Sequence, residues 1–132
     1  MELQDVNIGL ANFWKVTCLD KDGNIKWEEN KKNLITTVGL NHILDTQFHA
    51  TTQVTAWYIG LKEGAASSGS MTNGTSVDFT INATATIAGA FLNTAATGTS
   101  GTLYGVVDFS SSRAVISGDT LQVTVTVTAA SA

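Results

Sequence analysis

Two histidines and an aspartate, His42, Asp45 and His49, are the strongest candidates for chemistry in this chain. If the surrounding run is helical, their i, i+3 and i+7 spacing places all three side chains on one face. Imidazole and carboxylate groups arranged in this way can ligate a transition metal. A helix that ends near Phe48 would leave His49 outside it, however, and solvent-facing polar residues give the same spacing by chance. We therefore predict no metal site and no cofactor.

Cys18 is the only cysteine, which excludes an intrachain disulfide and a cysteine-built metal site. In an extended strand it shares a face with Trp14 and Val16, so it is expected to be a small buried apolar residue rather than a reactive thiol. The sequence contains no G-x-S-x-G, H-E-x-x-H or P-loop motif. We predict no catalytic residues and a chain that is not an enzyme.

Four large aromatic residues, Trp14, Trp27, Trp57 and Tyr58, raise the possibility of a surface that stacks on sugar rings. Large aromatic residues on strands more often fill the core between two sheets. Carbohydrate binding is therefore kept as an alternative function.

The first element that the sequence predicts is a β-hairpin. Residues 13–19 and 25–28 have strand character and flank the turn sequence 20–24, in which an Asp-Gly step supplies the positive φ that a tight turn needs. A short amphipathic helix is predicted next, near residues 37–48, with Thr36 or Thr37 as its N-cap. Its apolar positions fall on one face and are expected to cover the sheet: Leu40, Ile43, Leu44, and Gln47 or Phe48.

The remainder of the chain predicts short strands separated by Gly, Ser and Asn. A central strand is expected at 54–61, a loop at 62–76, and further strands at 77–81, 84–92, 103–109 and 114–116. The clearest pattern comes last, where apolar residues alternate strictly with Gln and Thr over 121–128. The predicted core consists of Phe13 or Trp14, Trp57, Ile59, Phe79, Leu121, Val123, Val125 and Val127.

About eight short strands at regular spacing are typical of an all-β protein. We predict an antiparallel β-sandwich, jelly-roll-like, that forms one domain over residues 1–132, which is a usual domain size. Residues 1–12 are expected to form an extended N-terminal arm whose apolar side chains lie along a neighbouring subunit. The chain contains no proline, one of the residues that protect exposed sheet edges.

Charge is distributed unevenly along the chain. Residues 1–63 contain six Lys and eight Asp or Glu, whereas residues 64–132 contain only Arg113, Asp78, Asp108 and Asp119. A surface so poor in charge repels its neighbours weakly and suits an assembly. The net charge of −4 gives no reason to bind phosphate backbones or anionic lipid, and no apolar stretch approaches the length of a membrane span. We predict neither nucleic acid nor membrane as a partner.

Several short segments resemble small structural proteins of tailed bacteriophages. They are 27–30 (Trp-Glu-Glu-Asn), 33–36 (Asn-Leu-Ile-Thr), 39–45 (Gly-Leu-Asn-His-Ile-Leu-Asp) and 55–61 (Thr-Ala-Trp-Tyr-Ile-Gly-Leu). The chain length and the predicted sandwich are also similar to those of capsid cement, or decoration, proteins. The resemblance implies no active-site residues.

That resemblance implies a structural virion protein that binds the outside of a phage capsid and stabilises the shell of major capsid protein. The expected partners are the major capsid protein and further copies of this chain, as a homodimer or homotrimer. The expected location is the capsid surface of the virion, after assembly in the host cytoplasm. The alternative is a tail- or fibre-associated module that binds host carbohydrate.

Overall fold

The structure is a computed structural model that describes residues 8–33, 35–62, 68–96 and 101–131. These residues form eight strands and one helix. In chain order they are β1 (Ile8–Leu19), β2 (Ile25–Asn33), α1 (Thr37–Phe48), β3 (Tyr58–Lys62), β4 (Ser68–Ser70), β5 (Ser76–Thr80), β6 (Ala85–Asn93), β7 (Leu103–Val115) and β8 (Thr120–Ser131).

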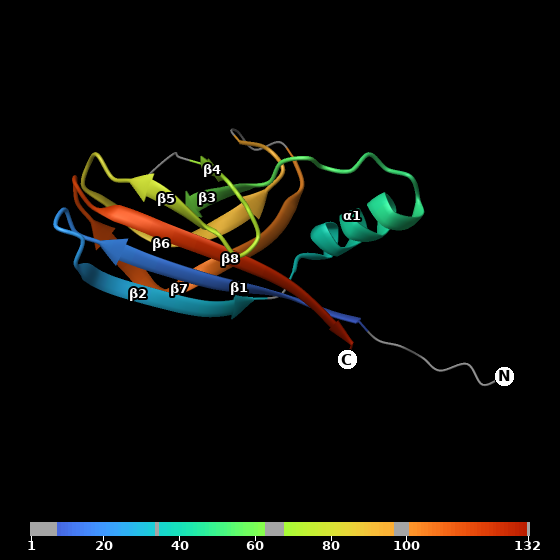
Figure 1. Ribbon diagram of the computed structural model, residues 1–132, viewed down its shortest axis with the longest axis horizontal. Coiled ribbons are helices and arrows are strands. Elements are labelled where there is room, and N and C mark those ends of the chain that lie inside the picture. Colours follow the sequence, from blue (N-terminus) through green and yellow to red (C-terminus); the bar gives the residue numbers. More distant parts are fainter. Residues whose placement is uncertain (1–7, 34, 63–67, 97–100, 132) are drawn as a thin grey trace.

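Two four-stranded antiparallel sheets pack against each other, as Figure 1 shows. Their strand orders are β2-β1-β8-β5 and β4-β3-β6-β7. The predicted all-β sandwich with a single short helix is confirmed. Its likeness to a jelly roll is limited to the two antiparallel sheets of four strands, because β1 with β2, β3 with β4, and β6 with β7 form pairs of consecutive strands within one sheet.

The predicted hairpin of residues 13–28 is present as β1 and β2. Its turn is held by Asp20, whose side-chain oxygen accepts hydrogen bonds from the backbone N–H groups of Asp22 and Asn24 at 2.8 and 2.9 Å. Gly23 has a φ of 83°, a value that glycine adopts without steric cost. The Asp-Gly signal in the sequence therefore identified the turn correctly.

The core lies between the two sheets, and β8 contributes its centre. Leu121, Val123 and Val125 are fully buried, while the Gln and Thr residues between them turn outward. Trp14, Ile59 and Phe79 are buried as predicted. The sequence predicted either Phe13 or Trp14 in the core. Trp14 is the core residue, because Phe13 lies on the outer face of the sheet and is 43% exposed.

Three predicted strand boundaries were wrong. The strand expected at 54–61 begins only at Tyr58, and the loop expected at 62–76 contains β4, which pairs with β3. The separate strands expected at 103–109 and 114–116 are one 13-residue strand, β7. Its ladder with β6 shifts register between Ile87 and Gly89, so the polar residues in the middle of β7 need not end the strand.

Helix α1 begins where the sequence predicted, because the Thr36 hydroxyl accepts a hydrogen bond from the backbone N–H of Gly39 at 2.9 Å. The same hydroxyl donates to the carbonyl oxygen of Leu103 at 2.6 Å, which ties the helix start to β7. Gly39 packs against Tyr104 so closely that a Cβ there would lie 3.0 Å from its atoms. The helix thus meets the sandwich through its first turn.

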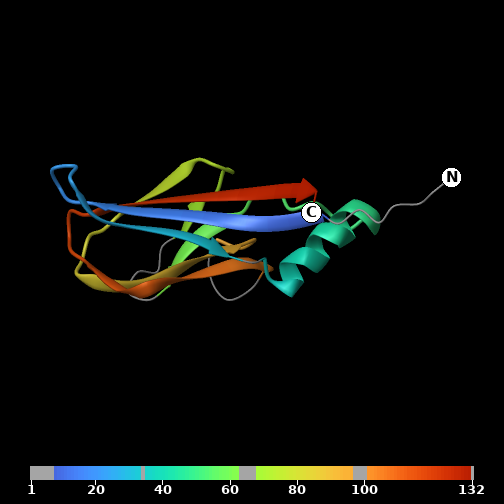
Figure 2. The ribbon, with the colours of Figure 1, turned by 90° about the horizontal axis from the view of Figure 1, so that it is seen from below.

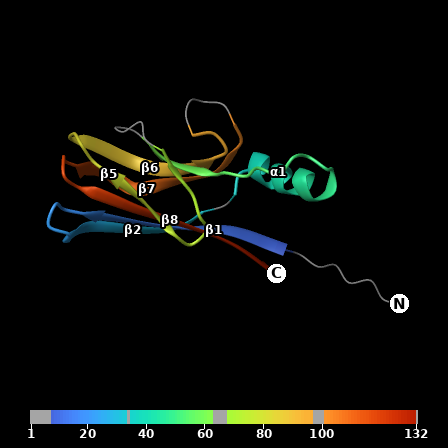
Figure 3. The same cartoon turned by 45° about the horizontal axis from the view of Figure 1, so that its top comes forward.

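The expectation that α1 covers the sheet was wrong. Gly39 is its only buried residue, and Figures 1, 2 and 3 show the helix projecting from one end of the sandwich. The first turn is fixed to β7, so most of the helix lies beyond the ends of the strands. Only Ile43 among its larger apolar residues packs against the core.

The predicted N-terminal arm was wrong in its second half. Residues 8–12 are the start of β1 and pair with the end of β8, from Ile8 opposite Ser131 to Asn12 opposite Val127. Residues 1–7 lie outside the described residues. The paired ends of β1 and β8 project from the same end of the molecule as α1 (Figures 1 and 3).

Candidate interaction surfaces

Helix α1 presents large apolar side chains to solvent. Leu40, Leu44 and Phe48 follow one another at four-residue intervals and therefore form a stripe along one face. They are 38%, 52% and 74% exposed, and Val38 is 58% exposed. Exposed apolar side chains grouped on one element are a feature of surfaces that bind another protein. We call Leu40, Leu44 and Phe48 the helix stripe.

An apolar pocket of about 250 Å³ lies between α1 and the adjacent end of the sandwich. Trp57 is central to it: its ring meets that of His42 at a centroid distance of 5.9 Å and that of Tyr104 at 5.2 Å, both edge to face. Burial raises the pKa of Tyr104. The pocket is lined by Ile43, Trp57, Met71, Asn73, Leu92, Tyr104 and Val127. These side chains suit an inserted apolar group better than a sugar.

The pocket offers few polar groups for hydroxyl recognition. The side-chain amide of Asn73 is already used, because it donates to the backbone oxygen of Val127 at 3.1 Å and accepts from its N–H at 2.8 Å. A sugar site needs such groups beside its aromatic ring, since they fix orientation and supply specificity.

The four aromatic residues considered for sugar stacking do not share one exposed surface. Trp14 is buried in the core. Trp27 packs edge to face on Phe109, with the Arg113 guanidinium 5.4 Å from its ring centroid. Trp57 lies in the apolar pocket, and Tyr58 begins β3. The spacing of these residues in the sequence could not reveal this separation, because it depends on which sheet each strand joins.

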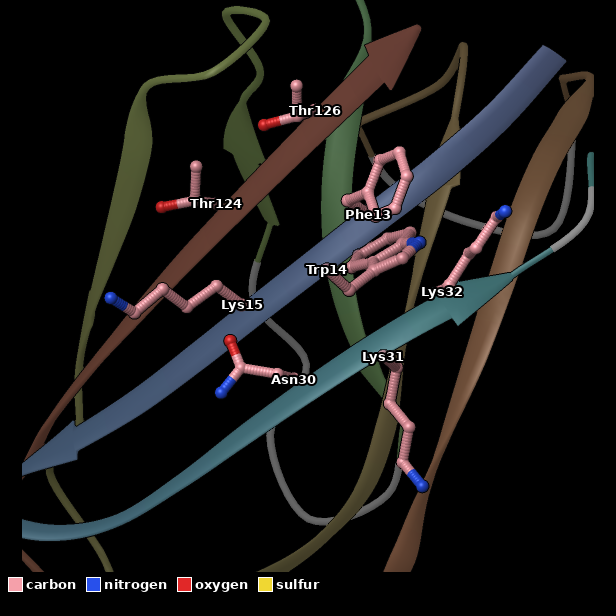
Figure 4. A pocket seen from close by; sticks show the side chains of 8 residues that line it. All are labelled: Phe13, Trp14, Lys15, Asn30, Lys31, Lys32, Thr124 and Thr126. Atoms are coloured by element: carbon pink, nitrogen blue, oxygen red, sulfur yellow. The ribbon is translucent and has the colours of Figure 1, made fainter.

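The outer face of the first sheet carries a shallow hollow of about 320 Å³, shown in Figure 4. Phe13 lies within it, and the ammonium group of Lys32 sits 5.6 Å from the Phe13 ring centroid. Lys15 and Lys31 also line the hollow. Lys31 lies opposite the buried Trp14, so its side chain is on the other face of the sheet, near Glu29. Neither of the two outward-facing lysines, Lys15 and Lys32, forms an ion pair with another described residue. The hollow is therefore a small basic and aromatic surface on a chain of negative net charge.

The structure separates the three residues considered as metal ligands. Asp45 and His49 come together, with 2.9 Å between Oδ1 of Asp45 and Nδ1 of His49, whereas the His42 ring packs on Trp57. Within the described ranges, no group of three His, Cys, Asp or Glu side chains is arranged to hold a metal ion.

A buried polar cluster surrounds Asp119 in the turn between β7 and β8. Its carboxylate accepts hydrogen bonds from the Lys26 ammonium at 2.8 Å and from the backbone N–H of Ile116 at 2.9 Å. Burial alone would raise the pKa of Asp119, but these partners together lower it. Cys18, fully buried beside it, has a pKa raised to about 11 by burial and by the Asp119 charge. Cys18 is thus buried, as the sequence predicted.

The Asp119 cluster predicts a pH dependence of stability. Because the folded-state pKa of Asp119 is lower than its unfolded value, its stabilising effect is complete above the unfolded value and is lost as pH falls through the folded one. Asp119→Asn is expected to lower the free energy of unfolding by about 2 kcal/mol at neutral pH. Urea denaturation at pH 7 and pH 3 should show this difference shrinking in acid; an equal difference at both pH values would contradict the prediction.

A second polar cluster joins the two sheets along one side. Arg113 of β7 donates to Oε1 of Glu29 on β2 from Nε at 3.0 Å and from Nη2 at 2.7 Å. Ser110 donates to the same oxygen at 3.0 Å. Burial opposes ionisation of Glu29, but Arg113 and Ser110 outweigh it and lower its pKa. Sequence reasoning did not find this pair, because its members are 84 residues apart.

Comparisons of the chain with models of known protein families, with curated proteins and with solved structures gave no match. No helix in the described part of the chain is long and apolar enough to cross a membrane.

Proposed function

We propose that this chain is a structural protein of a phage virion that binds the outside of the capsid and stabilises the shell of major capsid protein. The observation that carries the proposal is the helix stripe. A twelve-residue helix that buries only one glycine and exposes Leu40, Leu44 and Phe48 gains little from folding onto its own sandwich. Burial of the stripe against another protein would recover that apolar area.

Two further features support a binding role without catalysis. The basic hollow around Phe13 keeps Lys15 and Lys32 free of ion pairs with described residues, so it can receive an acidic surface. The two buried charged clusters, around Asp119 and Glu29, connect strands and take up their own donors. The role of these charged groups is therefore to stabilise the fold. The phage assignment itself rests on the sequence resemblance.

The proposal predicts that the double variant Leu44→Ser, Phe48→Ser binds the capsid with a dissociation constant at least about 100-fold higher than that of the wild type. The reason is that each buried large apolar side chain contributes roughly 1.5–3 kcal/mol. The measurement is binding of labelled protein to particles that lack it. Asn41→Ser is the matched control, because Asn41 is an exposed polar residue on the same helix. Unchanged occupancy of the double variant would remove the helix stripe from the interface.

Stabilisation is tested separately, with particles assembled with and without the protein. A protein that binds only the assembled shell shifts the equilibrium toward that shell, so its presence should raise the temperature at which particles release their contents. Equal heat resistance of both kinds of particle would exclude cementing. Binding of host glycans without binding of capsids would favour the tail or fibre alternative.

A further inference from the structure

Among the residues that the structure describes, the projecting end of β1 has one unpaired edge. β2 ends at Asn33, which lies opposite Asn12, so β2 does not reach Ile8–Ala11. On its other side this segment pairs with the end of β8, where Ile8 lies opposite Ser131 and Ala11 opposite Thr128. Within the described ranges, no third strand joins this two-stranded ribbon. Ribbons of two strands are marginally stable in water, and an open edge invites another strand.

The hydrogen bonds of β8 show which backbone groups of β1 face the open edge. The N–H and C=O of Val127 both bond to the side chain of Asn73, and the C=O of Val125 accepts from the N–H of Gly74. Residues 73 and 74 belong to the turn before β5, and β5 pairs with β8 on the side away from β1. The backbone polar groups of Val127 therefore point away from β1.

In an antiparallel ladder, two opposed residues either exchange both hydrogen bonds or exchange none, and the two kinds of pair alternate. Val127 lies opposite Asn12, so these two residues form a pair without hydrogen bonds. Two residues earlier in β1 the same holds for Leu10, and two before that for Ile8. Gly9 and Ala11 thus bond to β8, whereas Leu10 and Ile8 turn their N–H and C=O groups to the open edge.

We infer that this edge pairs antiparallel with the same edge of a second copy of the chain, around a two-fold axis at Gly9. In that register Ile8 of each copy lies opposite Leu10 of the other, and each of the two pairs exchanges two backbone hydrogen bonds. An antiparallel segment is complementary to itself, as a two-fold interface requires. Residues 8–11 carry no charge and no proline that would oppose this pairing.

A four-residue edge cannot form a stable dimer alone, because stable interfaces bury on the order of 800 Å² per partner. Helix α1 projects from the same end of the molecule, as Figures 1, 2 and 3 show. Val38 of this helix is 58% exposed and is not part of the helix stripe, so it can add apolar area to the pairing while the stripe stays free for the capsid. The inference specifies an interface for the self-association that the sequence resemblance implies, and it goes beyond the proposed capsid binding.

Leu10→Pro tests the pairing in the full-length chain. Proline at this position removes an N–H that faces the open edge and leaves in place the N–H groups of Gly9 and Ala11 that bond to β8. Sedimentation equilibrium is expected to show a wild-type dimer and a dissociation constant at least about 30-fold higher for the variant. Leu10→Ala is the matched control: it shortens the same side chain, keeps the N–H, and should remain a dimer.

The outcomes separate the interface from self-association itself. A wild-type chain that stays monomeric overturns both the edge pairing and self-association. A closed trimer overturns the two-fold pairing. Unchanged dimerisation of Leu10→Pro, or equal loss in both variants, overturns the edge pairing and leaves self-association standing.

If circular dichroism shows that the proline variant does not fold, the pairing is tested in the wild-type chain instead, by amide hydrogen exchange measured with nuclear magnetic resonance. Protection of the Leu10 amide that rises with protein concentration, beside constant protection at Ala11, supports the pairing. Concentration-independent exchange at Leu10 overturns it.

Discussion

Val125→Asp is expected to abolish folding. The Val125 side chain is fully buried at the centre of β8, opposite Trp14 of β1. None of the buried residues in the described part of the chain is a cation that could pair with a carboxylate there. Burying it unpaired costs several kcal/mol, against a total stability of roughly 5–15 kcal/mol for a domain. Circular dichroism and thermal melting should show an unfolded chain at neutral pH.

The neighbouring position supplies the control for this substitution. Thr126 lies on the same strand with its side chain toward the basic hollow, which contains Phe13 and Lys15. Thr126→Asp introduces the same charge in the same strand but outside the core, so it should fold and melt close to wild type. If Val125→Asp melted like Thr126→Asp, the assignment of the buried face of β8 would be wrong.

Arg113→Met is expected to destabilise the sandwich by about 3–5 kcal/mol at neutral pH, because it removes the cation that is hydrogen-bonded to the buried Glu29 carboxylate and leaves only the more distant charge of Lys31. Glu29 has a side-chain exposure of 7% and retains only the Ser110 hydroxyl as a side-chain hydrogen-bond partner in the variant. Urea denaturation gives the free energy of unfolding directly.

A double variant separates the cost of an unpaired charge from the worth of the pair. Glu29→Met combined with Arg113→Met replaces both charges by apolar side chains, which is often close to neutral for stability. The single variant should also recover part of its loss as pH falls, because an unpaired buried carboxylate takes up a proton more readily in the folded state. A double variant as unstable as the single one would contradict this account.

Local signals in the sequence determined the elements whose geometry depends on few residues. The Asp-Gly turn after β1 and the Thr36 cap of α1 form hydrogen bonds to residues two to four positions away. The alternation in β8 identified its buried face, because side chains of a strand point to opposite sides in turn. These signals were sufficient for the sandwich class, for most of the core and for the helix bounds.

Tertiary structure decided what lies opposite each of these elements. Periodicity placed Leu40, Leu44 and Phe48 on one face, but only the docking of Gly39 against Tyr104 directs that face away from the sheet. The sequence predicted residues 8–12 to be part of an extended arm on a neighbouring subunit, whereas their register with the end of β8 makes them a strand of their own sandwich.

The same distinction applies to charge. Arg113 is an isolated base in an almost uncharged half of the sequence, and only the packing of β7 against β2 brings it to Glu29. The sequence determined which faces are apolar and where the chain turns, since both depend on neighbouring residues. Which faces are covered, and which edges stay open, depended on contacts between residues far apart in the chain.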